Sequence, residues 1–317
     1  MKIEKEMIDK DYRIGLRLSK VILNPTVKRY KQINKINSRL INKPLKKFIS
    51  KQFYIQDNIT KNKVRVRVYM RKNHNHDCPG IIYLHGGGFV LNYPENSHSE
   101  IKHILNSIDC VIVAPDYRRS LDAPYPAAID DCYQCLLWMK ENSNSLGFRN
   151  NQIFVMGKSA GGNLAISLSL LARDYNKVSI AFQFPISPML DDRMNSLSMK
   201  DHDGPIWNEA QNRFAWDLYL KNVKDVPIYA APSRLKDYSN LPPTSGYIGD
   251  LDPFIDETVE FYKNLSKFNV ENNLKIFESV YHGFTNVNPM APKTIEAKEF
   301  ITSQLIYAKD NYFKEQN

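Results

Sequence analysis

The sequence predicts an α/β fold, with a mostly parallel central sheet flanked by helices. Short apolar runs, typical of buried strands, alternate with helix-like stretches over most of the chain. This alternation indicates βαβ units and a sheet covered on both faces. Of the 317 residues, 43% are hydrophobic, enough for a substantial core and against wholesale disorder. The length fits two domains or one large α/β domain with additions.

The first 50 residues are predicted to form one or two amphipathic helices. Apolar residues recur at helical spacing on both sides of Pro25: Ile14, Leu18, Val21 and Ile22 before it, and Ile33, Ile36, Leu40 and Ile41 after it. From about residue 52 the period changes. Val64, Val66 and Val68 alternate with Arg65, Arg67 and Tyr69, which predicts a strand with one solvated face.

Further candidate strands and helices follow in alternation. The strands are predicted at 81–84, 110–114, 153–156, 178–184, 244–248 and 274–280, and the helices near 97–107, 126–141, 160–173, 254–268 and 293–309. The strand around 64–68 and the strand at 81–84 are close together in the sequence with no helix between them. We therefore expect these two strands to form an antiparallel edge of the sheet.

Residues 187–237 interrupt the alternation. They contain no obvious strand but carry a helical stripe of Trp207, Phe214 and Leu218 that ends near Pro227. We therefore predict an N-terminal helical segment at 1–50 and an α/β domain at 51–317 with an insertion at about 187–237. The insertion and the N-terminal helices could pack together as a lid.

The net charge of +9 is concentrated at one end of the chain. Residues 1–51 hold 15 Lys and Arg against four acidic residues, a balance of +11; the remainder holds 28 basic and 30 acidic residues, a balance of −2. A uniformly basic nucleic-acid-binding protein is therefore excluded. The basic segment could tether a nucleic acid or an anionic membrane, but its apolar positions favour one packed face.

Four cysteines in a chain of this length do not make a disulfide scaffold. Cys132 and Cys135 form a CxxC pattern that could mean redox chemistry or half a zinc site. They fall within a helical pattern, however, and neither a second CxxC nor a spaced His pair accompanies them, so we predict buried thiols. No signal peptide and no apolar run long enough to span a bilayer is visible, and we expect a cytoplasmic protein.

The strongest local motif is Gly157-Lys158-Ser159-Ala160-Gly161-Gly162, placed between an apolar strand and a helix-forming stretch. A Ser at such a turn is lifted out of the sheet and held at a helix N-terminus, where developing negative charge is stabilised. The alternative is a tight turn that serves only helix packing.

A second motif, His85-Gly86-Gly87-Gly88, follows another buried strand. Its backbone N–H groups suit an oxyanion because they need little reorganisation as charge develops. A phosphate cradle is disfavoured, since neither a Gly-Lys-Ser/Thr ending nor Gly-x-Gly-x-x-Gly spacing is present. His85 is predicted to shape the loop by hydrogen bonding rather than to act as a base.

A nucleophilic serine needs a base and an orienting acid. His282 and Asp252 each follow a predicted parallel strand, at the edge of the sheet where ligands gather. Asp252 could instead cap the next helix, and Asp250 is a weaker candidate acid; Asp256, one turn on, could support Asp252. The order Ser159, Asp252, His282 favours a catalytic triad.

Together these motifs resemble the hormone-sensitive-lipase-like esterases of the α/β-hydrolase superfamily. That family carries an HGGG loop, a GxSAGG elbow, a DPxxDE segment and a histidine near the last strand, which match His85–Gly88, Gly157–Gly162, Asp252–Glu257 and His282. The stretch from Asp116 to Ala128 is also similar, and the match spans roughly 80–285.

The resemblance implies a role for each matching residue. Ser159 would be the nucleophile, His282 the general base and acid, and Asp252 the orienter, while the N–H groups of Gly87, Gly88 and Ala160 would form the oxyanion hole. It also implies that 1–50 and about 187–237 form a cap. The aromatic residues proposed for the substrate pocket are Phe89, Trp207 and Phe214.

Two departures from the family pattern stand out. Lys158 takes the place of the usual Asp or Thr before the nucleophile, and Ser120-Leu121-Asp122 replaces Ala-Pro-Glu. Lys158 could lower the pKa of His282 by repulsion or pair with a nearby acid, and we favour pairing.

The predicted function is serine hydrolysis of short-chain, acetyl-type carboxylic esters through an acyl-enzyme, with no metal or organic cofactor. The same triad could cleave an amide, formamide, lactone or carbamate, and a non-catalytic ligand receptor on this fold is the remaining alternative. The expected partner is a small-molecule ester; we expect no nucleic acid and no stable membrane insertion, and a homodimer is compatible with the sequence.

Overall fold

The computed structural model describes residues 1–16, 25–56 and 62–316. Its core is one eight-stranded sheet of order β1-β2-β4-β3-β5-β6-β7-β8. The strands are β1 (Ile49–Gln56), β2 (Lys63–Met70), β3 (Gly80–Leu84), β4 (Val111–Asp116), β5 (Ile153–Lys158), β6 (Phe182–Ile186), β7 (Thr244–Gly249) and β8 (Asn272–Phe277). The strands from β4 to β8 along this order are parallel, which confirms the predicted α/β class.

The antiparallel edge is real but is built differently from the prediction. β1, which the sequence indicated only as a change of period, pairs with β2, and β2 pairs with β4 rather than with β3. The short connection between β2 and β3 therefore crosses over β4. Strand adjacency of this kind depends on long-range packing, which local periodicity does not encode.

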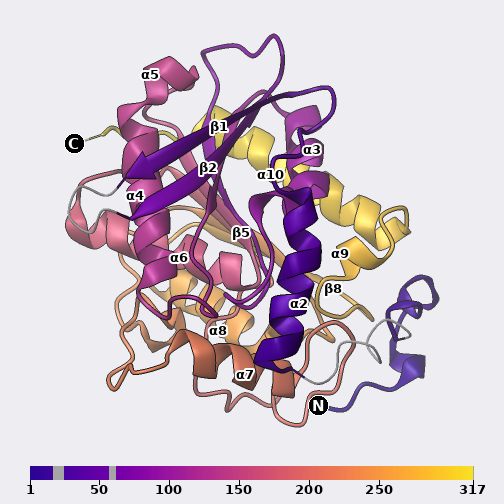
Figure 1. Ribbon diagram of the computed structural model, residues 1–317. Coiled ribbons are helices and arrows are strands. Elements are labelled where there is room, and N and C mark those ends of the chain that lie inside the picture. The colour runs from indigo at the N-terminus through magenta and orange to yellow at the C-terminus, as the bar shows by residue number, and fades with distance from the viewer. Residues whose placement is uncertain (17–24, 57–61, 317) are drawn as a thin grey trace.

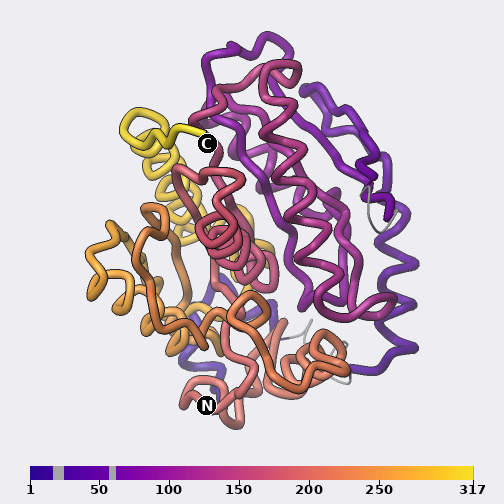
Figure 2. The backbone as a smooth tube through the Cα atoms, turned by 90° about the vertical axis from the view of Figure 1, so that its left-hand side faces the viewer, coloured from indigo at the N-terminus to yellow at the C-terminus, as the bar shows by residue number. Residues whose placement is uncertain are grey.

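Helices cover both faces of the sheet, as Figures 1 and 2 show. The helices are α2 (Val27–Asn37), α3 (His98–Ser107), α4 (Ala127–Glu141), α5 (Ser143–Leu146), α6 (Ala160–Tyr175), α7 (Glu209–Tyr219), α8 (Ile255–Lys267), α9 (Phe284–Val287) and α10 (Pro292–Asn311), with short 3-10 turns η1 (Lys5–Met7), η2 (Lys10–Tyr12), η3 (Ser38–Leu40), η4 (Pro94–Ser97) and η5 (Pro232–Arg234). α4 and α6 contribute to one apolar core, and α3 and α10 to a second core that includes side chains from the opposite sheet face.

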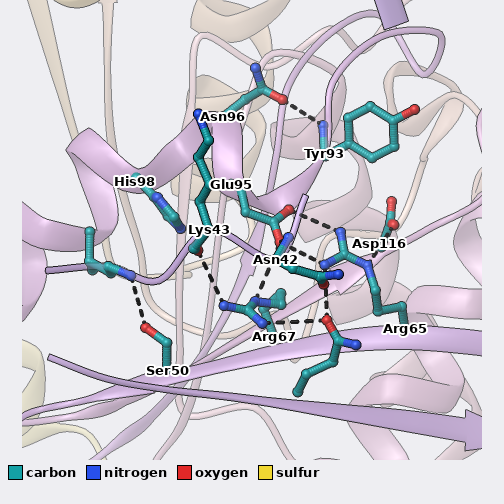
Figure 3. A network of polar contacts seen from close by, with 12 residues as sticks. Asn42, Lys43, Ser50, Arg65, Arg67, Tyr93, Glu95, Asn96, His98 and Asp116 are labelled. Atoms are coloured by element: carbon teal, nitrogen blue, oxygen red, sulfur yellow. Dashed lines mark hydrogen bonds and ion pairs between the residues drawn. The ribbon is translucent and has the colours of Figure 1, made fainter. Parts of the chain in front are cut away.

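The predicted solvated face of β2 is wrong. Arg65 and Arg67 are only 9% and 4% exposed, because η4 covers them with the carboxylate of Glu95. Arg65 donates two hydrogen bonds to Glu95, at 2.6 and 2.9 Å, and a third at 3.0 Å to Asp116 (Figure 3). Alternation therefore identified a strand correctly, but a buried charge network has the same sequence pattern as a solvated face.

The N-terminal residues and the 187–237 segment lie together beside the sheet. α2 lies next to α7 (Figure 1). The Tyr30 ring of α2 meets the Phe214 ring of α7 edge to face, with 5.2 Å between the ring centroids. The second predicted N-terminal helix is thus present, whereas much of the first lies outside the described residues. The expectation of one packed apolar face holds for Ile33 but not for Ile14 and Ile36, which are 56% and 60% exposed.

The four cysteines are all buried and unpaired, and Cys132 and Cys135 face the core from α4, which confirms the buried-thiol prediction. No helix in the described ranges is both long and apolar enough to cross a membrane.

Candidate active site

Ser159 lies at the sharp turn from β5 into α6. Its backbone has φ 59° and ψ −122°, a conformation that a non-glycine residue adopts only under constraint. The turn closes because the residues two positions before and after Ser159 are glycines: a Cβ on Gly157 would lie 2.0 Å from the carbonyl oxygen of Gly161, and a Cβ on Gly161 would lie 2.1 Å from that of Leu84. Backbone contacts thus determine where the Ser159 hydroxyl stands.

Ser159, His282 and Asp252 meet in one buried array. The Nε2 of His282 is 3.1 Å from the Oγ of Ser159, and its Nδ1 is 2.8 Å from the Oδ2 of Asp252. All three residues are at most 5% exposed. They are separated by up to 123 positions in the sequence, and the carboxyl ends of β5, β7 and β8 bring them together.

The hydrogen bonds assign the protons of this array. A carboxylate only accepts, so Nδ1 of His282 carries its proton and donates to Asp252, leaving Nε2 free to accept from the Ser159 hydroxyl. The second oxygen of Asp252 accepts the N–H of Phe254 at 3.0 Å, which fixes the carboxylate plane. The ring of Phe254 stands edge-on to His282 at 5.0 Å.

Asp250 and Asp256 lie outside the array. Asp250 accepts the N–H of Val280 at 3.3 Å, and Asp256 accepts that of Ser198 at 2.8 Å. Ser198 in turn donates to the carbonyl of Pro253, so Asp256 steadies the segment that carries Asp252, as a supporting residue would.

The glycine loop lies directly against the elbow. A Cβ on Gly86 would come 3.4 Å from the Cβ of Ser159. Gly87 and Gly88 have φ of 123° and 61°, and added Cβ atoms there would meet the carbonyl of Leu91 and the ring of Trp207. Only glycine fits both positions.

Three backbone N–H groups of the glycine loop and the elbow are candidate donors for a ligand. In the part of the chain that the structure describes, the N–H groups of Gly87, Gly88 and Ala160 have no hydrogen-bond partner. Ala160 is the first residue of α6, so its N–H has no acceptor within the helix. The positive end of the α6 dipole points the same way.

Side chains from α2 hold the glycine loop. Asn34 donates to the carbonyl of Val90 at 2.8 Å and accepts the N–H of Asn92 at 3.2 Å. Asn37 donates to the side-chain oxygen of Asn92, whose amide group donates to the carbonyl of Gly86 at 3.1 Å. The N-terminal segment is therefore bonded directly to the loop beside Ser159.

His85 shapes the loop, as the sequence predicted. Its Nδ1 donates to the carbonyl of Gly86 at 3.0 Å, and its ring stacks on Tyr117 at 4.1 Å. Complete burial lowers the pKa of His85 to about 4, so the ring is neutral at pH 7.

Lys158 pairs with an acid, in agreement with the prediction. Its Nζ is 3.6 Å from a carboxylate oxygen of Glu100, and it donates to Thr285 at 3.1 Å and to Asn286 at 2.9 Å. Burial lowers the pKa of Lys158, and the charge of Glu100 opposes that shift. Because Thr285 and Asn286 come just after His282, Lys158 ties the elbow to the loop that carries the histidine.

A cavity of about 410 Å³ opens over Ser159 and His282. Trp207 lines it, as expected. Phe89 and Phe214 do not: Phe89 is fully buried and stacks on Tyr219 at 3.8 Å, and Phe214 packs against Tyr30. Both side chains face the protein's own aromatic core, a direction that sequence alone does not give.

The sequence did not identify several residues around the cavity. Asn34, Asn92 and Glu100 come from segments where no motif marks them, and Ile33 reaches the cavity from α2. Asn92 has a positive φ of 77°, which Asn tolerates better than most residues. The residue type is compatible with this conformation, but the sequence alone does not show it.

Comparisons with known proteins identify the family of the chain. A family model described as the α/β hydrolase fold matches residues 81–286. The carboxylesterase NlhH of Mycobacterium tuberculosis is 30% identical over 241 residues, 74% of this chain and 75% of its own. Esterase LipI of the same organism is 29% identical over 226 residues, 70% of each chain. A solved bacterial heroin esterase superposes with a TM-score of 0.84 at 27% identity, covering 96% of this chain and 97% of its own.

The matched range contains the glycine loop, the elbow, Asp252 and His282, and the superposition extends to nearly the whole chain. The chain therefore belongs to the α/β-hydrolase family, and is an esterase-type enzyme of the group that resembles hormone-sensitive lipase.

Proposed function

We propose that the protein hydrolyses short-chain carboxylic esters with Ser159 as nucleophile. The observation that carries this proposal is the hydrogen-bonded series Ser159–His282–Asp252, with distances of 3.1 and 2.8 Å. A hydroxyl whose proton is accepted by an oriented imidazole is an activated nucleophile. The cavity of about 410 Å³ supports a small substrate.

In the proposed reaction, His282 accepts the Ser159 proton as the oxygen attacks the ester carbonyl. The resulting oxyanion is stabilised by the N–H groups of Gly87, Gly88 and Ala160, and Asp252 stabilises the imidazolium. His282 then gives its proton to the leaving alcohol. Water, deprotonated by His282, attacks the acyl-enzyme and releases the acid and free Ser159.

We further propose that residues 1–50 and about 187–237 act as a cap over this site. The hydrogen bonds from Asn34 to the glycine loop and the position of Trp207 in the cavity support it. The four unpaired, buried cysteines are compatible with a reducing, cytoplasmic setting.

The test is hydrolysis of a chain-length series of p-nitrophenyl esters by wild type and Ser159→Ala. We expect turnover that falls as the acyl chain lengthens, and a loss of about 10⁶ in kcat for the variant. p-Nitroanilides of the same acyl groups separate ester from amide cleavage. No turnover of any ester by folded protein, or faster anilide than ester cleavage, would overturn the proposal.

A further inference from the structure

One wall of the cavity above Ser159 is charged. Lys158, at the end of β5, and Glu100, in the first turn of α3, both line it, and their side chains are only 12% and 18% exposed. Asn96 and Ser97 of η4 extend the polar surface. The remaining lining includes apolar side chains: Ile33, Leu91, Ile206, Trp207 and Val287.

The protein itself uses the donors of Lys158. An ammonium group has three N–H donors. Thr285 and Asn286 accept two of them, at 3.1 and 2.9 Å, and the third direction is left to Glu100. Lys158 therefore stabilises this side of the cavity by binding Thr285, Asn286 and Glu100, and it has no N–H donor left for a bound molecule.

The hydrogen-bonding capacity of Glu100, by contrast, is only partly used by the protein. A carboxylate has about four acceptor sites. Within the described residues its only hydrogen-bond or ion-pair partner is Lys158, at 3.6 Å, well beyond the ~2.7–2.9 Å of a charge-assisted hydrogen bond. The Glu100 side chain is 18% exposed and lines the cavity. Its remaining acceptor sites can therefore bind a donor carried by a molecule in the cavity.

We infer that Glu100 is a specificity residue, which favours esters whose acyl or alcohol part carries a hydroxyl or ammonium group. The donor would reach the Glu100 carboxylate while the ester carbonyl lies at Ser159 and the apolar remainder lies against Trp207 and Ile206. This inference rests on the proposed function of Ser159. A site that hydrogen-bonds a substrate donor rejects the analogue without it, because its own polar group is then left unpaired.

The experiment compares matched esters that differ only in a donor. Methyl 3-hydroxybutyrate is paired with methyl 3-methylbutyrate, methyl 3-aminobutyrate with the same reference, and 2-hydroxyethyl butyrate with propyl butyrate. We expect wild type to favour the donor-bearing ester in at least one pair by tenfold or more in kcat/KM. A preference within the 3-hydroxybutyrate or 2-hydroxyethyl pair indicates recognition of a hydroxyl group, and a preference within the 3-aminobutyrate pair indicates recognition of an ammonium group.

Variants assign the preference to the carboxylate. Glu100→Leu is expected to bring the ratio close to one, and Glu100→Gln, which keeps an acceptor oxygen without the charge, to give an intermediate ratio. Lys102→Ala, an exposed position on α3, is the control and keeps the wild-type ratio. No preference in any pair, or a preference that survives Glu100→Leu, would overturn the inference.

A binding measurement separates this inference from the proposed function. Ser159→Ala protein is titrated with the same ester pairs, so that affinity is read without turnover. A donor preference in binding that Glu100→Leu removes supports the role of Glu100 whether or not the esters are cleaved. Hydrolysis of all esters with equal affinity within each pair would leave the proposed function intact and refute the specificity.

Discussion

The elbow around Ser159 and the glycine loop at 85–92 both position the chemistry, but different forces hold them. The elbow is fixed by main-chain contacts: Gly157 and Gly161 have no room for a Cβ, and Ser159 donates its N–H to the carbonyl of Ile186 at 2.8 Å. The glycine loop also has close main-chain contacts, but it is held in addition by side chains from distant segments. Asn34 comes from α2, 56 positions before the carbonyl that it binds.

The difference has a general consequence. A turn built from backbone contacts tolerates no added atoms, and steric substitution should break it outright. A loop held by polar side chains should fail gradually, one hydrogen bond at a time, and should respond to pH where a titratable group takes part. Three predictions test this contrast, from the largest effect to the smallest.

Gly161→Ala should be the most damaging change. Its Cβ would lie 2.1 Å from the carbonyl oxygen of Leu84 and 2.5 Å from that of His85, and both are backbone atoms that cannot move aside alone. We expect a loss of about 3 kcal/mol or more in the free energy of unfolding, measured by urea denaturation, together with loss of esterase activity.

Gly283→Ala is the matched control for that substitution. Gly283 has a positive φ of 74°, but the nearest atom to an added Cβ is 3.5 Å away. Only the backbone strain remains, which costs about 1 kcal/mol. Equal losses in the two variants would show that sterics at the elbow are not decisive.

The glycine loop should weaken in acid through His85. Burial lowers the pKa of His85 to about 4, below the ordinary 6.5. Between these two pH values the unfolded chain therefore binds a proton at His85 and the folded protein does not. Stability contributed by neutral His85 is complete above pH 6.5 and is lost as the pH falls toward 4, by about 3 kcal/mol.

His85→Phe should remove part of this pH dependence, since the ring stack on Tyr117 remains and the titration does not. The free energy of unfolding is measured from pH 7 to pH 4 in both proteins. Buried His202, whose pKa burial also lowers to about 4, is present in both and cancels in the difference. Parallel curves would contradict a neutral, buried His85.

Asn34→Ala tests the connection from α2 to the loop. It leaves the carbonyl of Val90 and the N–H of Asn92 without their partners, at a cost of about 1–3 kcal/mol. We expect kcat to fall severalfold with a smaller change in KM, because the loop carries the proposed oxyanion donors. Asn34→Asp keeps the acceptor for the N–H of Asn92, so its kcat should lie between those of wild type and Asn34→Ala.

Gln32→Ala, at an exposed position of the same helix, serves as the reference for that test. If it lowers kcat as much as Asn34→Ala does, helix propensity rather than the hydrogen bonds explains the effect.

The same contrast explains what the sequence could predict. The strand–Gly-x-Ser-x-Gly–helix pattern is local, so the elbow was predicted from it. The α/β class was predicted from the alternation of strand and helix patterns, and Asp252 and His282 from their places after strands. The bonds from Asn34 and the burial of Arg65 and Arg67 against Glu95 (Figure 3) depend on segments far apart in the chain. The directions of Phe89 and Phe214 depend on packing and were predicted wrongly.

The most direct test of the account is covalent trapping of the nucleophile. Folded protein is treated with a fluorophosphonate, and the modified residue is located by peptide mass spectrometry. The account predicts a single adduct on Ser159, absent from Ser159→Ala and formed at least about 100-fold more slowly in His282→Ala. An adduct on another serine, no adduct, or an unchanged rate in His282→Ala would contradict it.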